Sequence, residues 1–235
     1  MDSGNIGFVL LCAAFVFVMT PGLAMFYGGL VRKKNVVNTM MTSIFIIGVG
    51  IVMWVLFGYS LSFAPSGNAF IGDFRWLGLE GVSLTEGYTD DASIPNMVFS
   101  AFQMMFAVIT PALITGAVAG RMKFKSIFVF TIFWSLIVYY PLAHMVWGQG
   151  GLLGADGIGA LDFAGGDVVH ISSGVSALVL CILLGKRHDY EHSIYRIHNI
   201  PTVVLGASLL MFGWFGFNAG SALAADGLAA HAFMT

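Results

Sequence analysis

Residues 7–34 read GFVLLCAAFVFVMTPGLAMFYGGLVRKK, an uncharged apolar run that ends at three consecutive basic residues. A helix needs roughly 20 mostly apolar residues to cross a membrane, so this run is long enough. A secretory signal carries its basic residues before a shorter apolar core, whereas here they follow the run. The run is therefore predicted to be a membrane-spanning helix of the mature protein.

The rest of the chain repeats this pattern. Apolar runs predict six spans, at about residues 6–31, 36–63, 95–120, 126–147, 165–185 and 199–221. Residues 229–235 are expected to begin a seventh span. Of the 235 residues, 58% are hydrophobic and only 9% are charged, whereas a soluble domain carries about 25% charged residues. Because little polar chain remains to cover a soluble core, we expect an all-α, polytopic transmembrane helical bundle that forms one domain over residues 1–235.

The composition excludes several other classes of protein. A formal net charge of −2 offers no basic patch for nucleic acid. Cys12 and Cys181 both lie inside apolar runs and are expected to be small core side chains rather than a disulfide. The chain has no Walker loop, no His-Glu-x-x-His and no cysteine pair for zinc. We therefore expect a protein that is not an enzyme and that has no cofactor or metal.

Nine of the ten Lys and Arg residues follow the first, third and fifth predicted spans. These are Arg32, Lys33, Lys34, Arg121, Lys123, Lys125, Lys186, Arg187 and Arg196. Only Arg75 falls on the other side, in the long connecting segment 64–94. The positive-inside rule places the nine cations in the cytoplasm. We expect a multi-pass protein of the cell (inner) membrane with its N-terminus outside.

Two glycine pairs have the spacing that lets membrane helices approach closely. Gly116 and Gly120 form one pair, and Gly216 and Gly220 form the other. Such pairs are frequent in membrane helices, so both are interpreted as packing positions rather than functional ones.

Ionisable residues within predicted spans mark candidate functional sites, because placing them in hydrocarbon is costly. No Lys or Arg lies inside a span, which excludes a retinal Schiff base, a voltage sensor and an anion pore. His144 and His170 lie within spans, with Asp162 and Asp167 at the mouth of the fifth span. Asp162 is interpreted as a helix N-cap. Asp167 lies three residues before His170, so it either orients that imidazole or faces water.

A hydrolytic site and a haem site are two other interpretations of these residues. Asp167, His170 and the serines after it are neighbours on one helix, whereas a nucleophile and its base usually converge from separate elements. There is also no Gly-x-Ser-x-Gly elbow. Axial ligation of haem by His144 and His170 needs matched depth on facing helices, and His144 lies near the end of its span. A visible spectrum of the purified protein would test the haem alternative.

Several ordered sequence blocks carry a resemblance to a known family. They are PG at 21–22, FYGG at 26–29, RKKN at 32–35, FQ at 102–103 with Phe106, AHMVWG at 143–148, LDFAGG at 161–166, VVHI at 168–171, GKR at 185–187 and GWFGFNAGS at 213–221. Together these blocks resemble the ammonium transporter family (Amt/Mep/Rh), and its microbial Amt members most closely. The resemblance implies a transmembrane transporter of ammonium and ammonia.

Spacing alone assigns packing roles to the aromatic residues, and the resemblance implies more specific ones. By spacing, Phe102 and Phe106 share a helix face and Trp147 is an interfacial residue. By resemblance, Phe106, Trp147 and Ser221 would form an outer site that recruits ammonium. Phe102, Phe106 and Phe217 would line and gate the pore below that site.

The resemblance also assigns roles to three polar residues. His170 would be one of two pore histidines, and we expect it to be buried. Asp162 would be a structural carboxylate near the recruitment site, and Tyr139 would be a vestibule residue. Asp167 departs from the family pattern, in which an uncharged residue is usual at this place. The second pore histidine would belong to a later helix, and His231 is not its equivalent.

Family members resembled here are homotrimers of eleven-helix protomers, each with one pore between two inverted five-helix repeats. PII-type regulatory proteins can bind their cytoplasmic face. By this resemblance, the 235 residues hold the first repeat, one more helix and the start of another. An ammonium sensor, in which the same fold is coupled to a C-terminal signalling domain, is the alternative function.

Overall fold

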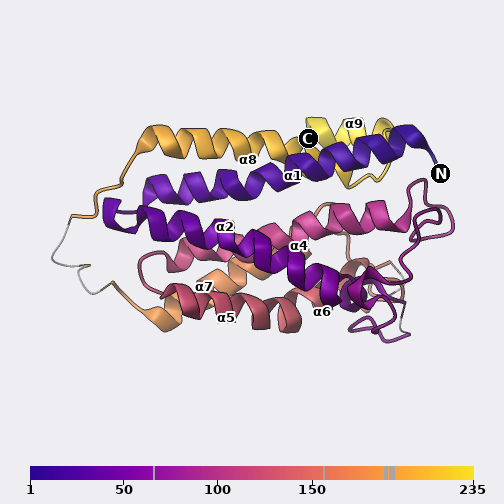
Figure 1. Ribbon diagram of the computed structural model, residues 1–235, viewed down its shortest axis with the longest axis horizontal. Helices are drawn as coiled ribbons and strands as arrows, with labels where there is room; N and C mark the ends of the chain where they lie inside the picture. The colour runs from indigo at the N-terminus through magenta and orange to yellow at the C-terminus, as the bar shows by residue number, and fades with distance from the viewer. Residues whose placement is uncertain (66, 156, 188–189, 191–193) are drawn as a thin grey trace.

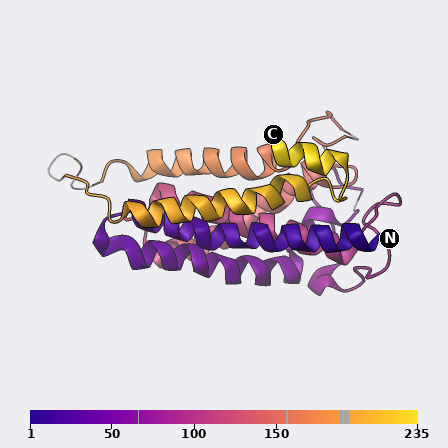
Figure 2. The same ribbon diagram turned by 90° about the horizontal axis from the view of Figure 1, so that it is seen from above.

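The computed structural model describes residues 1–65, 67–155, 157–187, 190 and 194–235. Within these ranges, six helical segments are long and apolar enough to cross a membrane: Ser3–Leu30, Lys33–Phe63, Asn96–Val118, Phe124–Trp147, Gly166–Leu184 and Ile200–Gly220. They run side by side along the long axis of the molecule (Figures 1 and 2). The predicted all-α bundle is confirmed, and a short helix lies where a seventh span was expected to begin.

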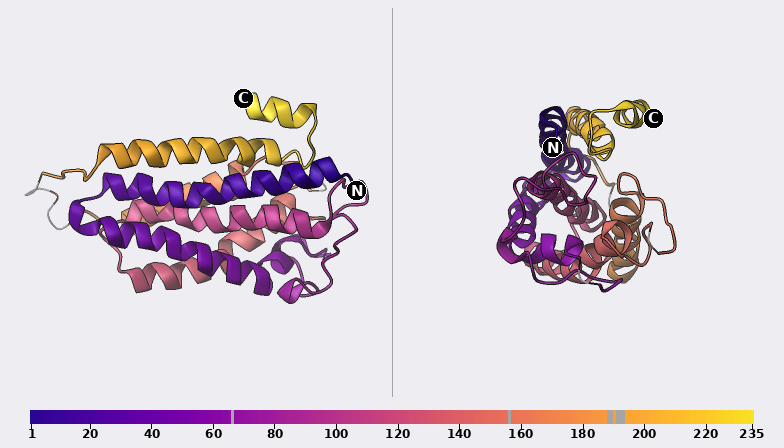
Figure 3. Two further views of the ribbon diagram at one scale, coloured as in Figure 1. Left: turned by 45° about the horizontal axis from the view of Figure 1, so that its top comes forward. Right: turned by 90° about the vertical axis from the view of Figure 1, so that its right-hand side faces the viewer.

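The six segments are built from helices that follow the chain in order. The first three are α1 (Ser3–Leu30), then α2 (Val36–Met53) continued by α3 (Tyr59–Phe63), then α4 (Asn96–Val118). The last three are α5 (Phe124–Trp134) continued by α6 (Tyr140–Trp147), then α7 (Ser172–Leu184) and α8 (Ile200–Gly220). The terminal α9 (Gly227–Met234) lies beside α8 at the edge of the bundle (Figure 3), where Phe233 stacks on Phe215.

Three segments contain a π-helical turn, in which the hydrogen bonds reach one residue further than in an α-helix. The turns are η2 (Trp54–Gly58) between α2 and α3, η4 (Ser135–Tyr139) between α5 and α6, and η5 (Gly166–Ile171) before α7. Each segment continues as a helix through its turn, so the residues after the turn point in a different direction.

Charge divides the two ends of the bundle. The described residues of the basic end are 31–35, 119–125, 185–187, 190 and 194–199, which follow α1, α4 and α7. Those of the acidic end are the N-terminus, 64–65, 67–95, 148–155, 157–165 and 221–226. In Figure 1 the N-terminus marks the acidic end at the right. Hydrophobic side chains occupy the length between the ends, and charged groups stay where water or headgroups solvate them.

Residue Asp2 fixes the start of α1 at the acidic end. Its side chain accepts a hydrogen bond from the backbone N–H of Asn5 at 2.8 Å. Its own backbone N–H donates to the Ser93 carbonyl at 2.8 Å, which ties the N-terminus to the long segment before α4. The cap explains why α1 begins at Ser3, three residues before the predicted span.

Helices α1 and α8 pack antiparallel along most of their length (Figures 1 and 3). The contact face of α8 carries Gly206, Gly213, Gly216 and Gly220, all of them buried. A Cβ atom added at Gly206 would lie 2.3 Å from the backbone nitrogen of Phe26. The two backbones therefore touch directly, and small residues are required because no side chain fits between them.

The two glycine pairs expected to serve packing differ in the structure. Gly216 and Gly220 both contact α1 near Cys12, as the packing interpretation requires. Gly116 packs against the ring of Tyr27. Gly120 lies beyond the end of α4 and has a φ of 70°, so it forms a turn rather than a helix contact.

We expect Gly206→Ala to destabilise the purified full-length protein, because the added methyl group would force α1 and α8 apart. Overpacking of this kind costs about 1–3 kcal/mol. Thermal unfolding in detergent measures the effect. The matched control is Gly7→Ala on α1, where a new Cβ meets no atom within 4 Å. Equal melting temperatures for the two variants would contradict the close backbone contact between α1 and α8.

Candidate functional site

Four aromatic side chains converge from three helices at the acidic end of the bundle. Phe102 and Phe106 lie one turn apart on α4, with ring centroids 5.0 Å apart. Trp147, the last residue of α6, presents its ring edge-on to Phe106 at 6.0 Å and 89°. Phe217 of α8 lies against the same Phe106 ring at 4.3 Å. Phe106 is therefore the ring at which α4, α6 and α8 meet.

A cavity of about 210 Å³ opens beside this aromatic cluster. Its lining brings together all three residues expected to recruit ammonium, with Phe102 and Asp162 from the other expected roles. The lining residues are Tyr88, Phe99, Phe102, Gln103, Phe106, Trp147, Asp162, Phe163, Ser221 and Leu223. One indole ring, several phenyl rings and several polar groups line this small space. Such a lining suits a compact cation.

Asp162 holds two parts of this site in place. Its carboxylate accepts four backbone N–H groups, from Gly165, Gly166, Asp167 and Val168. It thereby satisfies the N–H groups left free at the start of the η5 and α7 segment, as a helix cap does. Its backbone carbonyl accepts the indole N–H of Trp147 at 2.9 Å. The same residue therefore positions the Trp147 ring and begins the helix that carries His170.

Ser221 provides an acceptor on the opposite wall. It follows directly after α8, and its hydroxyl donates to the Phe217 carbonyl at 2.9 Å. This bond uses the hydroxyl proton, so the oxygen lone pairs are left to accept a hydrogen bond from a ligand.

His170 lies close to α8 and outside the lining of the cavity. Its ring stacks near Trp214 at 5.5 Å and near Phe217 at 5.8 Å. The expectation that His170 is buried is wrong for this chain, because its side chain is exposed. The reason is geometric: α8 covers one face of the imidazole, and no described helix covers the other.

Neither Tyr139 nor Asp167 lines this cavity. Tyr139 is buried inside the bundle on η4, with Trp134 and Tyr140 as its ring neighbours, and it is absent from the cavity lining. Trp147 follows eight residues later in the same helical segment, and the vestibule role of Tyr139 stays a prediction. Asp167 is half-buried, and in the described part of the chain its carboxylate makes no hydrogen bond with His170.

The ring nitrogens of His144 are both engaged by the backbone. Nδ1 lies 3.1 Å from the Ser62 carbonyl oxygen, and Nε2 lies 2.8 Å from that of Asn68. The side chain is fully buried and ties α6 to the chain after α3. An axial haem ligand needs a free ring nitrogen, so this geometry counts against the haem alternative. Within the described ranges, no group of three or more His, Cys, Asp or Glu residues is arranged to hold a metal ion.

Five of the ten lining residues were given no role from the sequence, and Gln103 and Tyr88 are the two of these with polar side-chain groups. Gln103 is only 8% exposed, and its Oε1 atom is buried without a hydrogen-bond partner among the described residues. Tyr88 comes from the 64–94 segment and stacks on Phe99 at 4.7 Å. Burial raises the pKa of its hydroxyl to about 12, so the group stays protonated and uncharged. The Phe102-Gln103 dipeptide was one of the blocks that carry the family resemblance, so Gln103 could have been singled out from the sequence. Nothing in the local sequence indicates a role for Tyr88.

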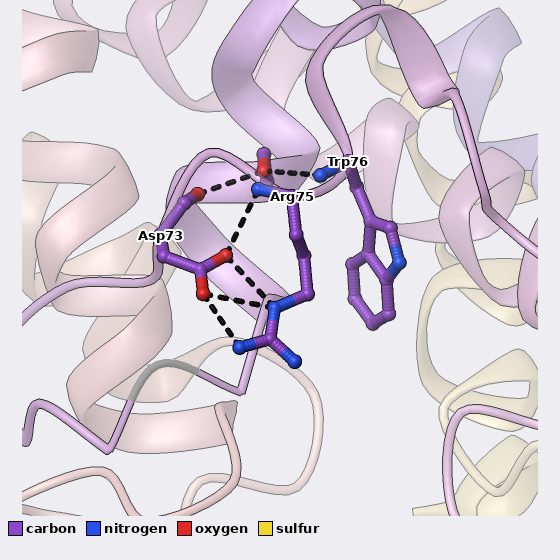
Figure 4. A network of polar contacts seen from close by, with 4 residues as sticks. Asp73, Arg75 and Trp76 are labelled. Atoms are coloured by element: carbon purple, nitrogen blue, oxygen red, sulfur yellow. Dashed lines mark hydrogen bonds and ion pairs between the residues drawn. The ribbon is translucent and has the colours of Figure 1, made fainter.

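Charge at the acidic end favours a cation. The one Arg of this end, Arg75, forms a bidentate ion pair with Asp73 (Figure 4), with Nη2 and Oδ2 2.6 Å apart. The hydrogen bonds from Arg75 lower the pKa of Asp73. The Ser60 hydroxyl bridges the backbone of Asp73 and Trp76 and anchors this segment to α3. The positive charge of Arg75 is thus balanced, and no other Lys or Arg opposes a cation at this end.

The sequence of residues 7–235 matches the Ammonium Transporter Family. The chain belongs to this family. Members of this family are not enzymes, so the expectation that the protein is not an enzyme is confirmed. The family is also the one that the sequence blocks had indicated.

Individual relatives support the family assignment. The chain is 53% identical over 234 residues to an ammonium transporter of Bacillus subtilis strain 168, covering 100% of this chain and 56% of that protein. It is 45% identical over 254 residues to one from Mycobacterium tuberculosis strain H37Rv, with 100% and 53% covered. The chain spans about half the length of the curated relatives it matches.

Solved structures of ammonium transporter family proteins share the fold. The crystal structure of Saccharomyces cerevisiae Mep2 superposes with a TM-score of 0.87 at 37% identity, covering 100% of this chain and 52% of that one. A structure described as a sensor Amt protein superposes with a TM-score of 0.82 at 30% identity, covering 97% and 56%. The all-helical bundle is therefore the ammonium transporter fold.

We expect Asp162→Ala to destabilise the full-length transporter by about 2 kcal/mol, the upper end of the cost of losing a helix cap. Four backbone N–H groups would lose their acceptor at once. Thermal unfolding in detergent gives the measurement. Asp167→Ala removes a carboxylate five residues later without removing a cap, and we expect it to melt close to the wild type. A larger loss for Asp167→Ala would contradict this assignment.

Proposed function

We propose that the protein transports ammonium by recruiting the ion in the aromatic cavity, removing its proton and passing ammonia along a route that contains His170. The observation that carries this proposal is the convergence of Phe106, Trp147 and Ser221 on one small cavity at the acidic end. Membership in the ammonium transporter family supports the choice of ligand.

The chemistry of the cavity matches a cation with hydrogen-bond donors. Ammonium presents four N–H groups, and the Ser221 oxygen has lone pairs to accept one of them. Trp147 and Phe106 meet at nearly a right angle. The faces of aromatic rings are electron-rich and their edges are not, so a cation in the cavity gains a cation–π contact where it lies over a ring face. Potassium carries the same charge but has no N–H group to donate to the Ser221 oxygen, so this hydroxyl favours binding of ammonium over potassium.

The energies indicate that the ion stops at this cavity. Moving an uncompensated ion into hydrocarbon costs tens of kcal/mol. Cation–π contact returns about 2 kcal/mol when desolvated, and a charged hydrogen bond to Ser221 returns about 1.5–3 kcal/mol more. These contributions hold an ion at the mouth but do not carry it through. The substrate therefore crosses as neutral ammonia, and the proton leaves by another route.

The arrangement of rings sets the order of events. Phe106 and Phe217 are in contact below the cavity, with centroids 4.3 Å apart, so they exclude water and hydrated ions until they move. His170 comes next, 5.8 Å beyond Phe217. Its ring nitrogens have no partner among the described residues, so they are available to hydrogen-bond ammonia or relay a proton.

The family resemblance also supports proposals about the assembly. The basic end would face the cytoplasm by the positive-inside rule, which places the aromatic cavity outside the cell. A homotrimer and a PII-type partner at the cytoplasmic face stay predictions of the resemblance.

We expect Trp147→Leu to raise the apparent KM for ammonium about 30-fold, since losing about 2 kcal/mol of cation–π energy corresponds to that factor. Ser221→Ala should act in the same direction and weaken discrimination against potassium. Uptake of methylammonium by the full-length protein in transport-deficient cells, with ammonium or potassium as competitor, gives the measurement. Trp147→Phe and Ser221→Thr keep a ring and a hydroxyl, and should fall between wild type and the other variants. Unchanged uptake and competition for Trp147→Leu and Ser221→Ala would disprove the recruitment site.

We expect His170→Ala to abolish ammonium transport or to let potassium pass, because the route would lose its only polar partner among the described residues beyond the Phe pair. Currents and fluxes through proteoliposomes containing the full-length protein distinguish the two results. His198→Ala at the basic end is the control and should behave as wild type. Wild-type fluxes and selectivity for His170→Ala would refute a pore role for this histidine.

An ammonium sensor is the second candidate function, favoured by the structural match to the sensor Amt protein. The same cavity would then bind ammonium and report it to a signalling domain. Ammonium binding by the full-length protein without any flux would favour the sensor, whereas flux favours the transporter.

A further inference from the structure

A second cavity adjoins the one lined by Phe106, Trp147 and Ser221, which we call the recruitment cavity. This side cavity has a volume of about 280 Å³. Its walls come from the end of the 64–94 segment, the start of α4 and the turn after α8. Tyr88, Phe99 and Leu223 line both cavities. The two spaces are therefore neighbours, and these three residues form the partition between them.

Tyr88 and Phe99 form the aromatic part of the partition. Their rings stack in parallel, with centroids 4.7 Å apart and an angle of 5° between the planes. The backbone N–H of Gln149 donates to the Tyr88 hydroxyl oxygen at 3.0 Å, and the Gln149 side-chain amide donates to the Tyr88 carbonyl at 2.8 Å. Phe99 is buried in the bundle. Neither ring can move aside without breaking these contacts.

Leu223 forms the aliphatic part of the partition. It is half-buried and packs against the hydrophobic core that includes Phe99 and Phe102. Its φ is 57°, in the left-handed region that residues with a branched apolar side chain rarely adopt. A leucine keeps this conformation only where its surroundings hold the backbone in place.

Asn5 of α1 supplies that hold. Its Oδ1 atom accepts the backbone N–H of Ala225 at 2.9 Å, and its Nδ2 atom donates to the Ser93 hydroxyl at 2.9 Å. The same hydroxyl donates to the Leu223 carbonyl at 3.4 Å. The Leu223 N–H donates to the Gly220 carbonyl at 2.9 Å. One side chain of α1 thus ties both walls of the side cavity together and keeps Leu223 between the two cavities.

The partition limits the room for a ligand beside the aromatic cluster. The recruitment cavity has a volume of about 210 Å³, and its rings are fixed by their contacts with one another. Without the Leu223 side chain, the space of the side cavity would join it. An alkyl group attached to a bound cation would then extend past Leu223 toward Ile94 and Ala222, which are apolar lining residues of the side cavity.

We propose that Leu223 determines the size of the cation that the recruitment cavity accepts. This inference rests on the proposed function, because it sets a limit on the ligand bound there. A primary alkylammonium ion has the same charge as ammonium and keeps three N–H donors, but its alkyl chain meets the Leu223 side chain. Leu223 is therefore a specificity-determining residue, whereas Phe106, Trp147 and Ser221 bind the charged group.

Binding of two ions to the purified full-length protein tests the inference. Ammonium chloride and ethylammonium chloride are titrated at constant ionic strength, and the rise in melting temperature gives an apparent Kd for each ion. The test variant is Leu223→Gly, which removes the side chain at a φ that favours glycine.

Two control variants accompany the test variant. Leu223→Asn keeps a branched side chain with the same number of non-hydrogen atoms, and asparagine tolerates this φ. Leu84→Gly makes the same substitution in the 64–94 segment, where Leu84 is 72% exposed and lines neither cavity.

We expect the wild type to bind ammonium at least about tenfold more tightly than ethylammonium, as a pocket closed to an alkyl group does. In Leu223→Gly this preference should fall to about threefold or less, while the Kd for ammonium stays within about threefold of the wild-type value. Leu223→Asn and Leu84→Gly should keep the wild-type preference.

An unchanged preference in Leu223→Gly would overturn the inference. So would equal weakening of both ions in that variant, which indicates a structural role alone, or a wild type without any preference. Trp147→Leu in the same titration should weaken both ions and keep their ratio, which separates this inference from the recruitment site itself. A wild type that does not bind ammonium contradicts both. Melting temperatures without ligand check folding, and Leu223→Ala replaces Leu223→Gly if that variant unfolds.

Discussion

A charge or an unpaired polar group placed in hydrocarbon costs more than any single contact in this bundle returns. The described residues meet this constraint at many positions, although Gln103 keeps a buried amide oxygen without a partner among them. Lys and Arg are confined to the helix ends, and buried hydroxyls donate to carbonyls of their own helices, as Thr110 and Ser173 do. The buried His144 has a backbone carbonyl oxygen beside each ring nitrogen, and a neutral imidazole donates to only one of the two. In the proposed function, the same constraint lets the acidic end hold a cation while the interior admits only a neutral molecule.

The candidate site depends on contacts between segments that are distant in sequence. Asp162 caps one helix with its carboxylate and holds Trp147 with its carbonyl. The seam between α1 and α8 places Phe217 and Ser221 against residues from α4. The proposed recruitment site and the segment that carries His170 are thus connected through one carboxylate, and the glycine-rich face of α8 sets the position of Phe217.

Much of the fold could be predicted from the sequence, because a helix in hydrocarbon needs a long apolar run with its charged residues at the ends. Six apolar runs predicted six helices, and the alternating cations predicted two unlike ends. Phe106, Trp147 and Ser221 were assigned through ordered sequence blocks, and they line one cavity. Spacing alone would have left them as packing and interfacial residues, since each aromatic comes from a different part of the chain.

The remaining features depend on tertiary structure that local sequence does not encode. Tyr88 reaches the cavity because the 64–94 segment folds back over α4, a path that its glycines permit but do not specify. His170 is exposed because no described helix covers the second face of its imidazole, and Tyr139 is buried inside the bundle rather than in the cavity lining. Gly120 was predicted to be one of a packing pair within a helix. Because α4 ends at Val118, Gly120 is instead a loop residue.

The π-helical turn at Ser135–Tyr139 has a consequence for the direction in which α6 points. One residue more or less in a helix rotates everything after it by about 100°. A deletion within this turn would leave a continuous, equally apolar helix, and hydropathy would not register the change. Trp147 would nevertheless point away from Phe106, so the turn sets the direction in which the indole projects from the helix axis.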